Sequence, residues 1–200
     1  MFRLLLVFVS VMSLQSQTGY GKYQWWAWTP GDAVDDSSLS MFSPGYHPDQ
    51  PLPFDHSLHA GKMKIDCEYC HSAARRSISA GIPPMNTCMG CHRFAATDKP
   101  AIKQLTKMYE NNQAIEWTKV HDLPDFVRFS HEVHVHAKGP DGKDLINCQT
   151  CHGPVETMTT AEQVAPLQMG WCLECHNQEW PDDGSGRKTY APVSCNTCHY

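Results

Sequence analysis

Five copies of a Cys-x-x-Cys-His motif constrain this chain more than any other feature. All ten cysteines of the 200-residue sequence fall within these copies, so none is left for a structural disulfide. The copies are Cys67–His71 (CEYCH), Cys88–His92 (CMGCH), Cys148–His152 (CQTCH), Cys172–His176 (CLECH) and Cys195–His199 (CNTCH). This motif attaches c-type haem, because the two thiols form thioethers with the porphyrin and the adjacent histidine ligates the iron.

Zinc binding and dithiol redox chemistry are the alternatives for paired cysteines, but neither requires a histidine directly after the second cysteine. Histidine makes up 12 of the 200 residues, and five such neighbours would arise by chance about once in a million cases. We therefore expect five covalently bound haem c groups. The attachment residues are Cys67, Cys70, Cys88, Cys91, Cys148, Cys151, Cys172, Cys175, Cys195 and Cys198, and the proximal iron ligands are His71, His92, His152, His176 and His199.

The haem content predicts the fold class. Five haems leave about 40 residues for each, so the porphyrins should supply much of the core that a chain of this size needs. We expect a loop-rich multihaem cytochrome c with short α-helices and little or no β-structure. The formal charge of −5 excludes a phosphate-binding face rich in Lys and Arg, so nucleic acid is not expected as a partner.

An internal repeat indicates four distal ligands on the other side of the irons. The stretches FDHSLH (54–59) and FSHEVH (129–134) share the pattern Phe-x-His-x-x-His. Each precedes two haem motifs, and the second copy carries one further motif at the C-terminus. The candidates are His56, His59, His131 and His134. Two histidines three residues apart share one helix face. Since one iron has only one free axial position, each pair should serve two neighbouring haems.

The fifth distal ligand is less determined by the sequence. His121 lies just ahead of the second repeat and is the preferred candidate. Met169 and Met85 each stand three residues before a motif and are the alternatives, since a thioether ligand raises the reduction potential of a haem. His136 has no counterpart in the repeat and is interpreted as a neighbouring or surface group, with distal ligation as its alternative.

The chain divides into three segments. Residues 1–28 are predicted to be an N-terminal transmembrane anchor, with an uncleaved signal segment as the alternative. Residues 29–53 have the Pro, Gly, Ser and Asp content of a linker. The haem domain follows over 54–200, with a two-haem unit at 54–93, a connecting region at 94–122 and a three-haem unit at 123–200. Apolar periodicity predicts a helix from Pro100 to Asn111 in the connecting region.

Several stretches between Phe54 and Cys175 resemble a known family. They are FDHSLHAGKMKIDCEYCH, AGIPPMNTCMGCH, WTKVHDLPDFVRFSHEVH, CHGPVETM and LQMGWCLECH. In this order they resemble the pentahaem cytochrome c subunit of alternative complex III, and more widely the cytochrome c3/c7-like multihaem group. The family's histidine after Lys-Val and its two Phe-x-His-x-x-His pairs fall on His121, His56, His59, His131 and His134.

The resemblance implies an electron-transfer subunit on the periplasmic face of a quinol-oxidising complex in the inner (cytoplasmic) membrane. Its partners would be an iron–sulfur subunit, polytopic quinol-binding membrane subunits and a mono-haem cytochrome c. Electrons would pass through the haems towards a periplasmic cytochrome c or a terminal oxidase.

We find no catalytic residues and do not expect a substrate site of its own. The alternatives are a free periplasmic electron shuttle and a reductase of small oxyanions, which would need an iron with an open distal position.

Overall fold

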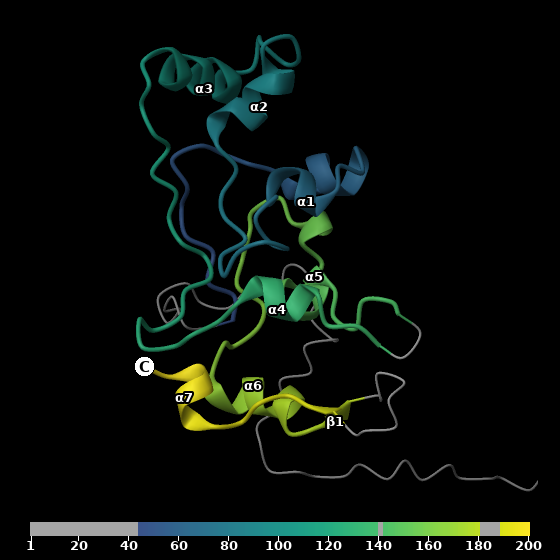
Figure 1. Cartoon of the computed structure of the whole chain (residues 1–200). Helices are drawn as coiled ribbons and strands as arrows, with labels where there is room; N and C mark the ends of the chain where they lie inside the picture. Colours follow the sequence, from purple (N-terminus) through teal and green to yellow (C-terminus); the bar gives the residue numbers. More distant parts are fainter. Residues whose placement is uncertain (1–43, 140–141, 181–188) are drawn as a thin grey trace, which may run out of the picture.

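Short helices joined by long loops form an elongated molecule in the computed structural model, which describes residues 44–139, 142–180 and 189–200. The helices are η3 (Ser57–Lys62), α1 (Cys67–Cys70), α2 (Met85–His92), α3 (Pro100–Glu110), α4 (His131–Val135), α5 (Cys148–His152), η4 (Val155–Thr157), α6 (Met169–His176) and α7 (Cys195–Cys198). In Figure 1, α2 and α3 lie at one end and α1, α5 and α4 in the middle. Helices α6 and α7 lie at the other end, beside the C-terminus.

Each haem motif forms or ends a helix. Helices α1, α2, α5, α6 and α7 all contain a Cys-x-x-Cys sequence. Helical geometry brings residues i, i+3 and i+4 to one face, so the two cysteines and the following histidine can point the same way. Side chains cap two of these short helices, because Asp66 accepts from Glu68 N–H (2.7 Å) and Asn147 accepts from Thr150 N–H (3.0 Å).

Strand structure is minimal in the described residues, as the sequence predicted. Strands β1 (Glu179–Trp180) and β2 (Thr189–Tyr190) have two residues each and pair antiparallel. Single bridges join Val127 to His199 and Lys138 to Asp144. The first of these bridges holds the C-terminal residues against the segment that precedes the second Phe-x-His-x-x-His repeat.

A small apolar core lies between α2 and α3. It contains Leu52, Met89, Leu105 and Met108, each at most 8% exposed. Helix α3 ends one residue before the predicted boundary, and its buried residues lie on the face that the periodicity indicated. Leu52 is part of this core. The end of the predicted linker (residues 29–53) is therefore packed against the folded domain.

Hydrogen bonds show how the end of the expected linker is fixed. The Gln50 amide donates to the Thr118 carbonyl (2.9 Å) and accepts from Thr118 N–H (3.0 Å). Gly45 N–H donates to the Gln163 carbonyl (2.7 Å), and Gln163 N–H donates to the Tyr46 carbonyl (2.9 Å). Because backbone and amide groups pair here, residues 45–52 belong to the folded domain.

The two repeats interlock. Ser57 N–H, at the start of η3, donates to the Met158 carbonyl (2.9 Å) in the loop that follows the third haem motif. In the second repeat, His131 N–H donates to the Ile78 carbonyl (3.1 Å) and Glu132 N–H donates to the Ser77 carbonyl (3.2 Å). Each helix that carries a candidate distal pair therefore binds a loop of the other haem unit.

Within residues 44–139, 142–180 and 189–200, no helix combines the length and the apolar character that a membrane crossing requires. The anchor predicted at residues 1–28 lies outside the described residues.

Replacing Gly61 by alanine should push η3 away from η4. A Cβ at this position would lie 2.2 Å from the backbone oxygen of Glu156, which cannot move aside as a side chain could. We expect the free energy of unfolding to fall by about 2 kcal/mol, as for other overpacking changes. Thermal or denaturant unfolding followed by circular dichroism measures it.

Gly170→Ala is the matched control, because a Cβ at this helical glycine meets nothing within 4 Å. It should change the stability by less than about 1 kcal/mol, and in the stabilising direction. Equal losses in the two variants would contradict the close approach of η3 and η4.

Candidate functional site

The proximal histidines are oriented through one ring nitrogen. The Nδ1–H groups of His71, His92 and His176 donate to the carbonyls of Gly81 (2.7 Å), Ala95 (3.1 Å) and Pro192 (2.8 Å). A carbonyl can only accept, so the proton is on Nδ1 and the lone pair is on Nε2. Metal-bound histidines are held in this way, with the second nitrogen donating to a backbone carbonyl.

Three candidate distal histidines are held in the same way. His59 Nδ1–H donates to the Asp55 carbonyl (2.8 Å), and His134 Nδ1–H donates to the Ser130 carbonyl (2.7 Å). Both acceptors lie four residues earlier in the chain, so this bond repeats between the two copies. His131 Nδ1–H donates to the Ile78 carbonyl (2.9 Å) of the other unit. Each of these rings therefore also keeps Nε2 available.

The phenylalanine of each repeat orders both imidazoles of its pair. Phe54 stacks on His59 (ring centroids 4.6 Å apart, 15° between planes) and meets His56 edge-on (4.8 Å, 77°). Phe129 stacks on His134 (4.5 Å, 27°) and meets His131 edge-on (4.9 Å, 88°). The two copies thus share one local geometry, in which the apolar ring restricts imidazole rotation.

Three distal rings face three proximal rings at nearly one distance. The centroids are 6.1 Å apart for His59 and His92, 6.1 Å for His134 and His176, and 6.3 Å for His131 and His152. A metal–imidazole bond is about 2 Å long and the ring centroid lies about 1 Å beyond the bonded nitrogen, so one iron between two imidazoles separates their centroids by about 6 Å. The three pairs fit a single iron each.

His121, His131 and His152 gather in the middle of the molecule. His121 meets His152 edge-on at a centroid distance of 4.5 Å, which is too short for an iron between them. The His121 Nε2 atom is buried and has no partner among the described residues. A metal ion would satisfy this orphaned nitrogen.

Burial keeps several of these imidazoles neutral. The pKa of His152 is lowered to about 3 and that of His121 to about 4, in both cases mainly by burial and further by neighbouring imidazoles. Burial also lowers the pKa of His56 and of His134. Only a neutral imidazole can donate a lone pair to iron, so these environments suit ligation at neutral pH.

The remaining proximal histidines have different neighbours. His71 lies near enough to His56 to interact with it electrostatically, and no close ring contact joins these two in the described part of the chain. His199 stacks on Phe126 (5.8 Å, 28°). The structure brings none of the five predicted distal histidines against the His199 ring within the described residues.

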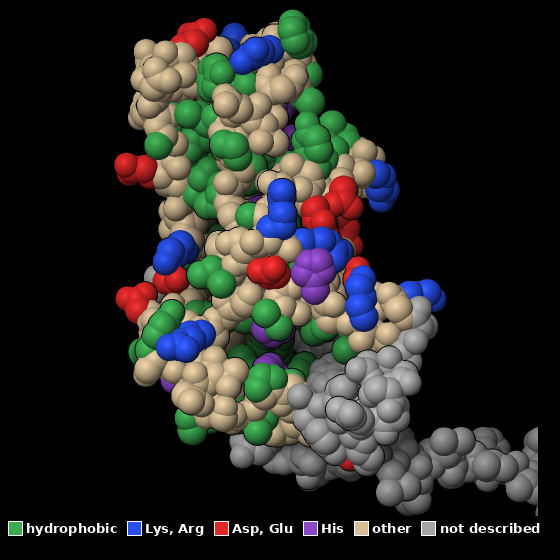
Figure 2. Space-filling view, viewed as in Figure 1, with side chains coloured by type: hydrophobic (Ala, Val, Ile, Leu, Met, Phe, Trp, Pro, Cys, Tyr) green, Lys and Arg blue, Asp and Glu red, His purple; other side chains and the backbone are tan. Residues whose placement is uncertain are grey.

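Exposure separates the predicted ligands from the other histidines. The ten imidazoles predicted as proximal or distal ligands are all partly buried, whereas His47 and His136 are exposed. Several histidines visible in Figure 2 lie in recesses between hydrophobic side chains. The two methionine alternatives differ, because Met169 is 66% exposed and Met85 packs against the core around Met89.

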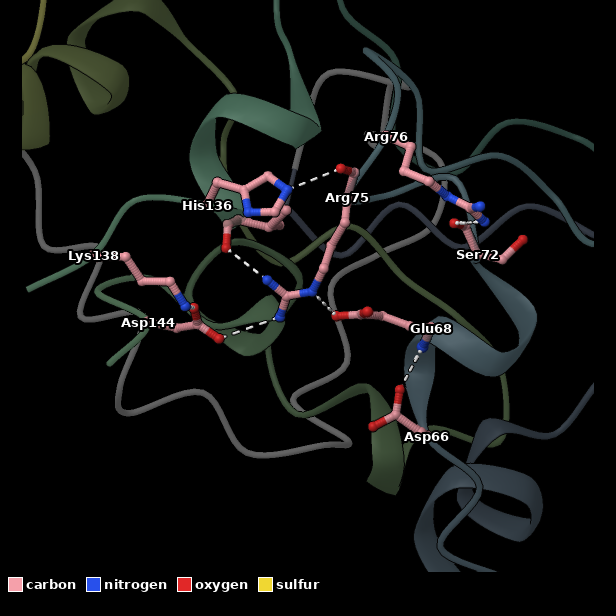
Figure 3. A network of polar contacts seen from close by, with 9 residues as sticks. Asp66, Glu68, Ser72, Arg75, Arg76, His136, Lys138 and Asp144 are labelled. Carbon is pink, nitrogen blue, oxygen red and sulfur yellow. Dashed lines mark hydrogen bonds and ion pairs between the residues drawn. The ribbon is translucent and has the colours of Figure 1, made fainter. Parts of the chain in front are cut away.

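His136 takes part in a polar network instead of facing a proximal ring (Figure 3). Its Nε2–H donates to the Arg75 carbonyl (2.9 Å), which is the reverse of the Nδ1 arrangement of the other rings. The Arg75 guanidinium donates to Glu68 (2.6 Å), to the Val135 carbonyl (3.0 Å) and to Asp144 (3.2 Å). Lys138 also pairs with Asp144. The network joins the first haem motif to the segment after α4.

The residues present therefore fit covalently attached haem. None of the ten cysteines pairs in a disulfide, and each Cys-x-x-Cys pair stands beside its proximal histidine in or next to a short helix. Thiol and imidazole supply the covalent bonds and the axial bond that a haem c requires. Burial raises the pKa of the Cys151 thiol to about 11, so this sulfur lies in an apolar environment that suits a porphyrin edge.

The sequence did not predict two kinds of contact in this site. The carbonyls that accept from Nδ1 are backbone atoms without a residue signature, and Phe126 carries no motif that would place it on His199. His136 is exposed, and the sequence had indicated a neighbouring or surface group because it has no counterpart in the first repeat.

Comparison with known proteins agrees with this geometry. The family of cytochrome c7 and related cytochromes c matches residues 127–200. The chain carries a multihaem cytochrome c domain. It is also similar to the protein named menaquinone reductase, multihaem cytochrome c subunit, of Nitratidesulfovibrio vulgaris strain Hildenborough. The identity is 26% over 169 residues, covering 76% of this chain and 77% of the relative. A c-type cytochrome domain of this class binds haem c covalently and transfers electrons.

Replacing His59 by alanine should leave one iron without its distal ligand. The 6.1 Å pairing with His92 predicts that this iron becomes high-spin and binds carbon monoxide when reduced. Electron paramagnetic resonance and the Soret spectrum under carbon monoxide measure the change. His136→Ala is the control and should keep the low-spin spectrum, because its Nε2 is already bonded to Arg75.

The sequence assigns His121 to the fifth iron, whereas the structure places its ring beside His152 and brings no distal histidine against His199 among the described residues. If His121 is that ligand in the haem-loaded protein, His121→Ala should produce one high-spin iron. The buried, partnerless Nε2 of His121 is the reason, and the same spectra test it. An unchanged low-spin spectrum would show that another residue completes that iron, with Met169 and Met85 as the candidates to substitute next.

Proposed function

We propose that the chain binds five haem c groups and relays electrons between them within a membrane-bound quinone-linked complex of the alternative complex III type. The repeated axial geometry carries this proposal. Three imidazole pairs at 6.1–6.3 Å match one iron each, and the five motifs use every cysteine of the chain.

The protein's contribution to electron transfer is to fix and insulate the irons. Backbone carbonyls hold the Nδ1–H groups, and this sets the direction of Nε2. Phe54 and Phe129 restrict the rings of the distal pairs. When bound, haem c supplies one-electron redox chemistry at a potential that its axial ligands and burial adjust. Two imidazoles leave no open position for a substrate on the three irons that the ring pairs match. We propose that the other two irons are six-coordinate as well, so that this subunit has no reaction of its own.

The quinone link rests on two similarities. The sequence resembles the pentahaem subunit of alternative complex III through the stretches between Phe54 and Cys175. The relative from Nitratidesulfovibrio vulgaris is named as a subunit of a menaquinone reductase. Both support a haem subunit of a quinone-linked complex. The resemblance to alternative complex III adds the proposal that this complex lies in the inner membrane with the haem subunit on its periplasmic side. We infer an iron–sulfur subunit, polytopic quinol-binding subunits and a mono-haem cytochrome c as its partners.

The direction of electron flow has two candidates. Similarity to alternative complex III favours electrons that leave quinol for a periplasmic cytochrome c or a terminal oxidase. The name of the relative favours electrons that pass towards menaquinone. The purified complex distinguishes them by its activity with quinol and oxidised cytochrome c against its activity with reduced cytochrome c and menaquinone.

Intact mass under denaturing conditions tests the haem content. We expect the polypeptide plus five haem masses, because thioether bonds survive denaturation. Any smaller number would contradict the use of all ten cysteines.

Affinity purification of the tagged chain from detergent-solubilised membranes tests the complex. We expect polytopic subunits and an iron–sulfur subunit to co-purify. Release of the chain into the soluble fraction without detergent, and without partners, would instead establish a free electron shuttle.

A further inference from the structure

We propose that the five haems form one unbranched row in the order second, first, third, fourth, fifth, numbered by their motifs along the chain. The second haem and the fifth haem are then the two ends where electrons enter and leave. This inference rests on the proposed binding of five haems and adds the route between them. It differs from the order of the motifs in the sequence, because the first haem and not the second adjoins the third.

The arrangement of the motif helices supports this order. From one end of the molecule to the other, Figure 1 shows α2, then α1, then α5, with α6 and α7 both at the far end. Helix α2 carries the second motif and is displaced to the end of the molecule, where it packs against α3. Helix α7 carries the fifth motif and lies at the opposite end with the C-terminus. Elements so far apart in one view are apart in space as well.

Printed contacts aside, the fold connects the motifs in the same order. His59, eight residues before the first motif, faces His92 of the second motif. Glu68, inside the first motif, accepts from Arg75, which also donates to Asp144, four residues before the third motif.

The chain of contacts continues to the other end. His176 of the fourth motif donates to the Pro192 carbonyl (2.8 Å), three residues before the fifth motif. Since each motif holds one haem c, neighbouring motifs mark neighbouring haems.

The distal pairs join the same neighbours. His131 and His134, three residues apart, face His152 and His176, so one helix spans the third and fourth haems. His59 faces His92, and His56 interacts with His71, so η3 spans the second and first haems. No distal helix spans the first and third haems. Their proximal histidines, His71 and His152, nevertheless lie near each other.

Both ends border exposed surface. Phe94, two residues after the proximal histidine of the second haem, is 88% exposed. Tyr200, directly after the proximal histidine of the fifth haem, is 81% exposed. Because these side chains are exposed, the protein surface next to each terminal haem is accessible to a redox partner.

A redox titration of the full-length wild-type protein followed by nuclear magnetic resonance tests the order. The haem methyl signals are assigned through contacts with the attached cysteines and histidines. The Coulomb interaction between two haems falls with the distance between them. The midpoint potential of each haem therefore depends most on the redox state of its nearest neighbours. We expect the third haem to respond to reduction of the first and fourth haems more strongly than to reduction of the second.

A distal substitution gives an independent test. His59→Met should raise the potential of the second haem, because thioether ligation favours the reduced iron. It should alter the midpoint of the first haem more than that of the third. His134→Met is the matched variant in the other repeat, and it should alter the third and fifth haems.

A third haem that responds more strongly to the second than to the first would overturn the proposed order, even in a protein that binds five haems. The wild-type titration gives this result without any variant, so a misfolded variant does not prevent the test. A haem count below five would instead overturn the proposed function.

Discussion

The structure depends on the different bonding roles of the two ring nitrogens of histidine. In six candidate ligands, Nδ1–H is given to a backbone carbonyl and Nε2 is left with a free lone pair; these are His59, His71, His92, His131, His134 and His176. Each bond ties a helix or loop to the ring it orients. The apolar core of the described residues is small, with Leu105 and Met108 among its few buried side chains. A chain of this size cannot be stabilised by so little apolar burial, so imidazole–iron bonds and porphyrin contacts must supply much of the remaining stability.

The two repeats are related in sequence and joined in space. Each distal helix hydrogen-bonds to a loop of the other unit, through Ser57 to Met158 and through His131 to Ile78. The Arg75 network adds charged contacts between the first motif and the segment after α4 (Figure 3). The groups of this network are partly exposed, so their pairing contributes less than buried contacts would. These contacts mainly fix the relative positions of chain segments that bear different haems.

Local patterns in the sequence predicted what local chemistry determines. The motif helices, the minimal strand content and the face of the helix from Pro100 follow from the cysteine spacing and the apolar periodicity. The two Phe-x-His-x-x-His repeats predicted four distal ligands, and the structure gives the two pairs one local geometry. His136, which has no counterpart in the first repeat, was predicted to be a neighbouring or surface group and is exposed. The sequence did not predict which proximal ring each distal ring faces. That depends on how distant loops pack, as with His131 and His152. The position of His121 beside His152 has the same origin. The Pro-rich sequence around Leu52 predicted a linker. The structure instead buries this single apolar side chain in the core between α2 and α3.

The docking of the two repeats has a consequence for biogenesis. Ser57 binds the Met158 carbonyl and His131 binds the Ile78 carbonyl, so each unit holds a loop that belongs to the other. These backbone bonds hold the two units together around the space in which the imidazoles ligate iron. We infer that the two units dock only once their haems are attached, because the porphyrins fill the space that the small apolar core leaves.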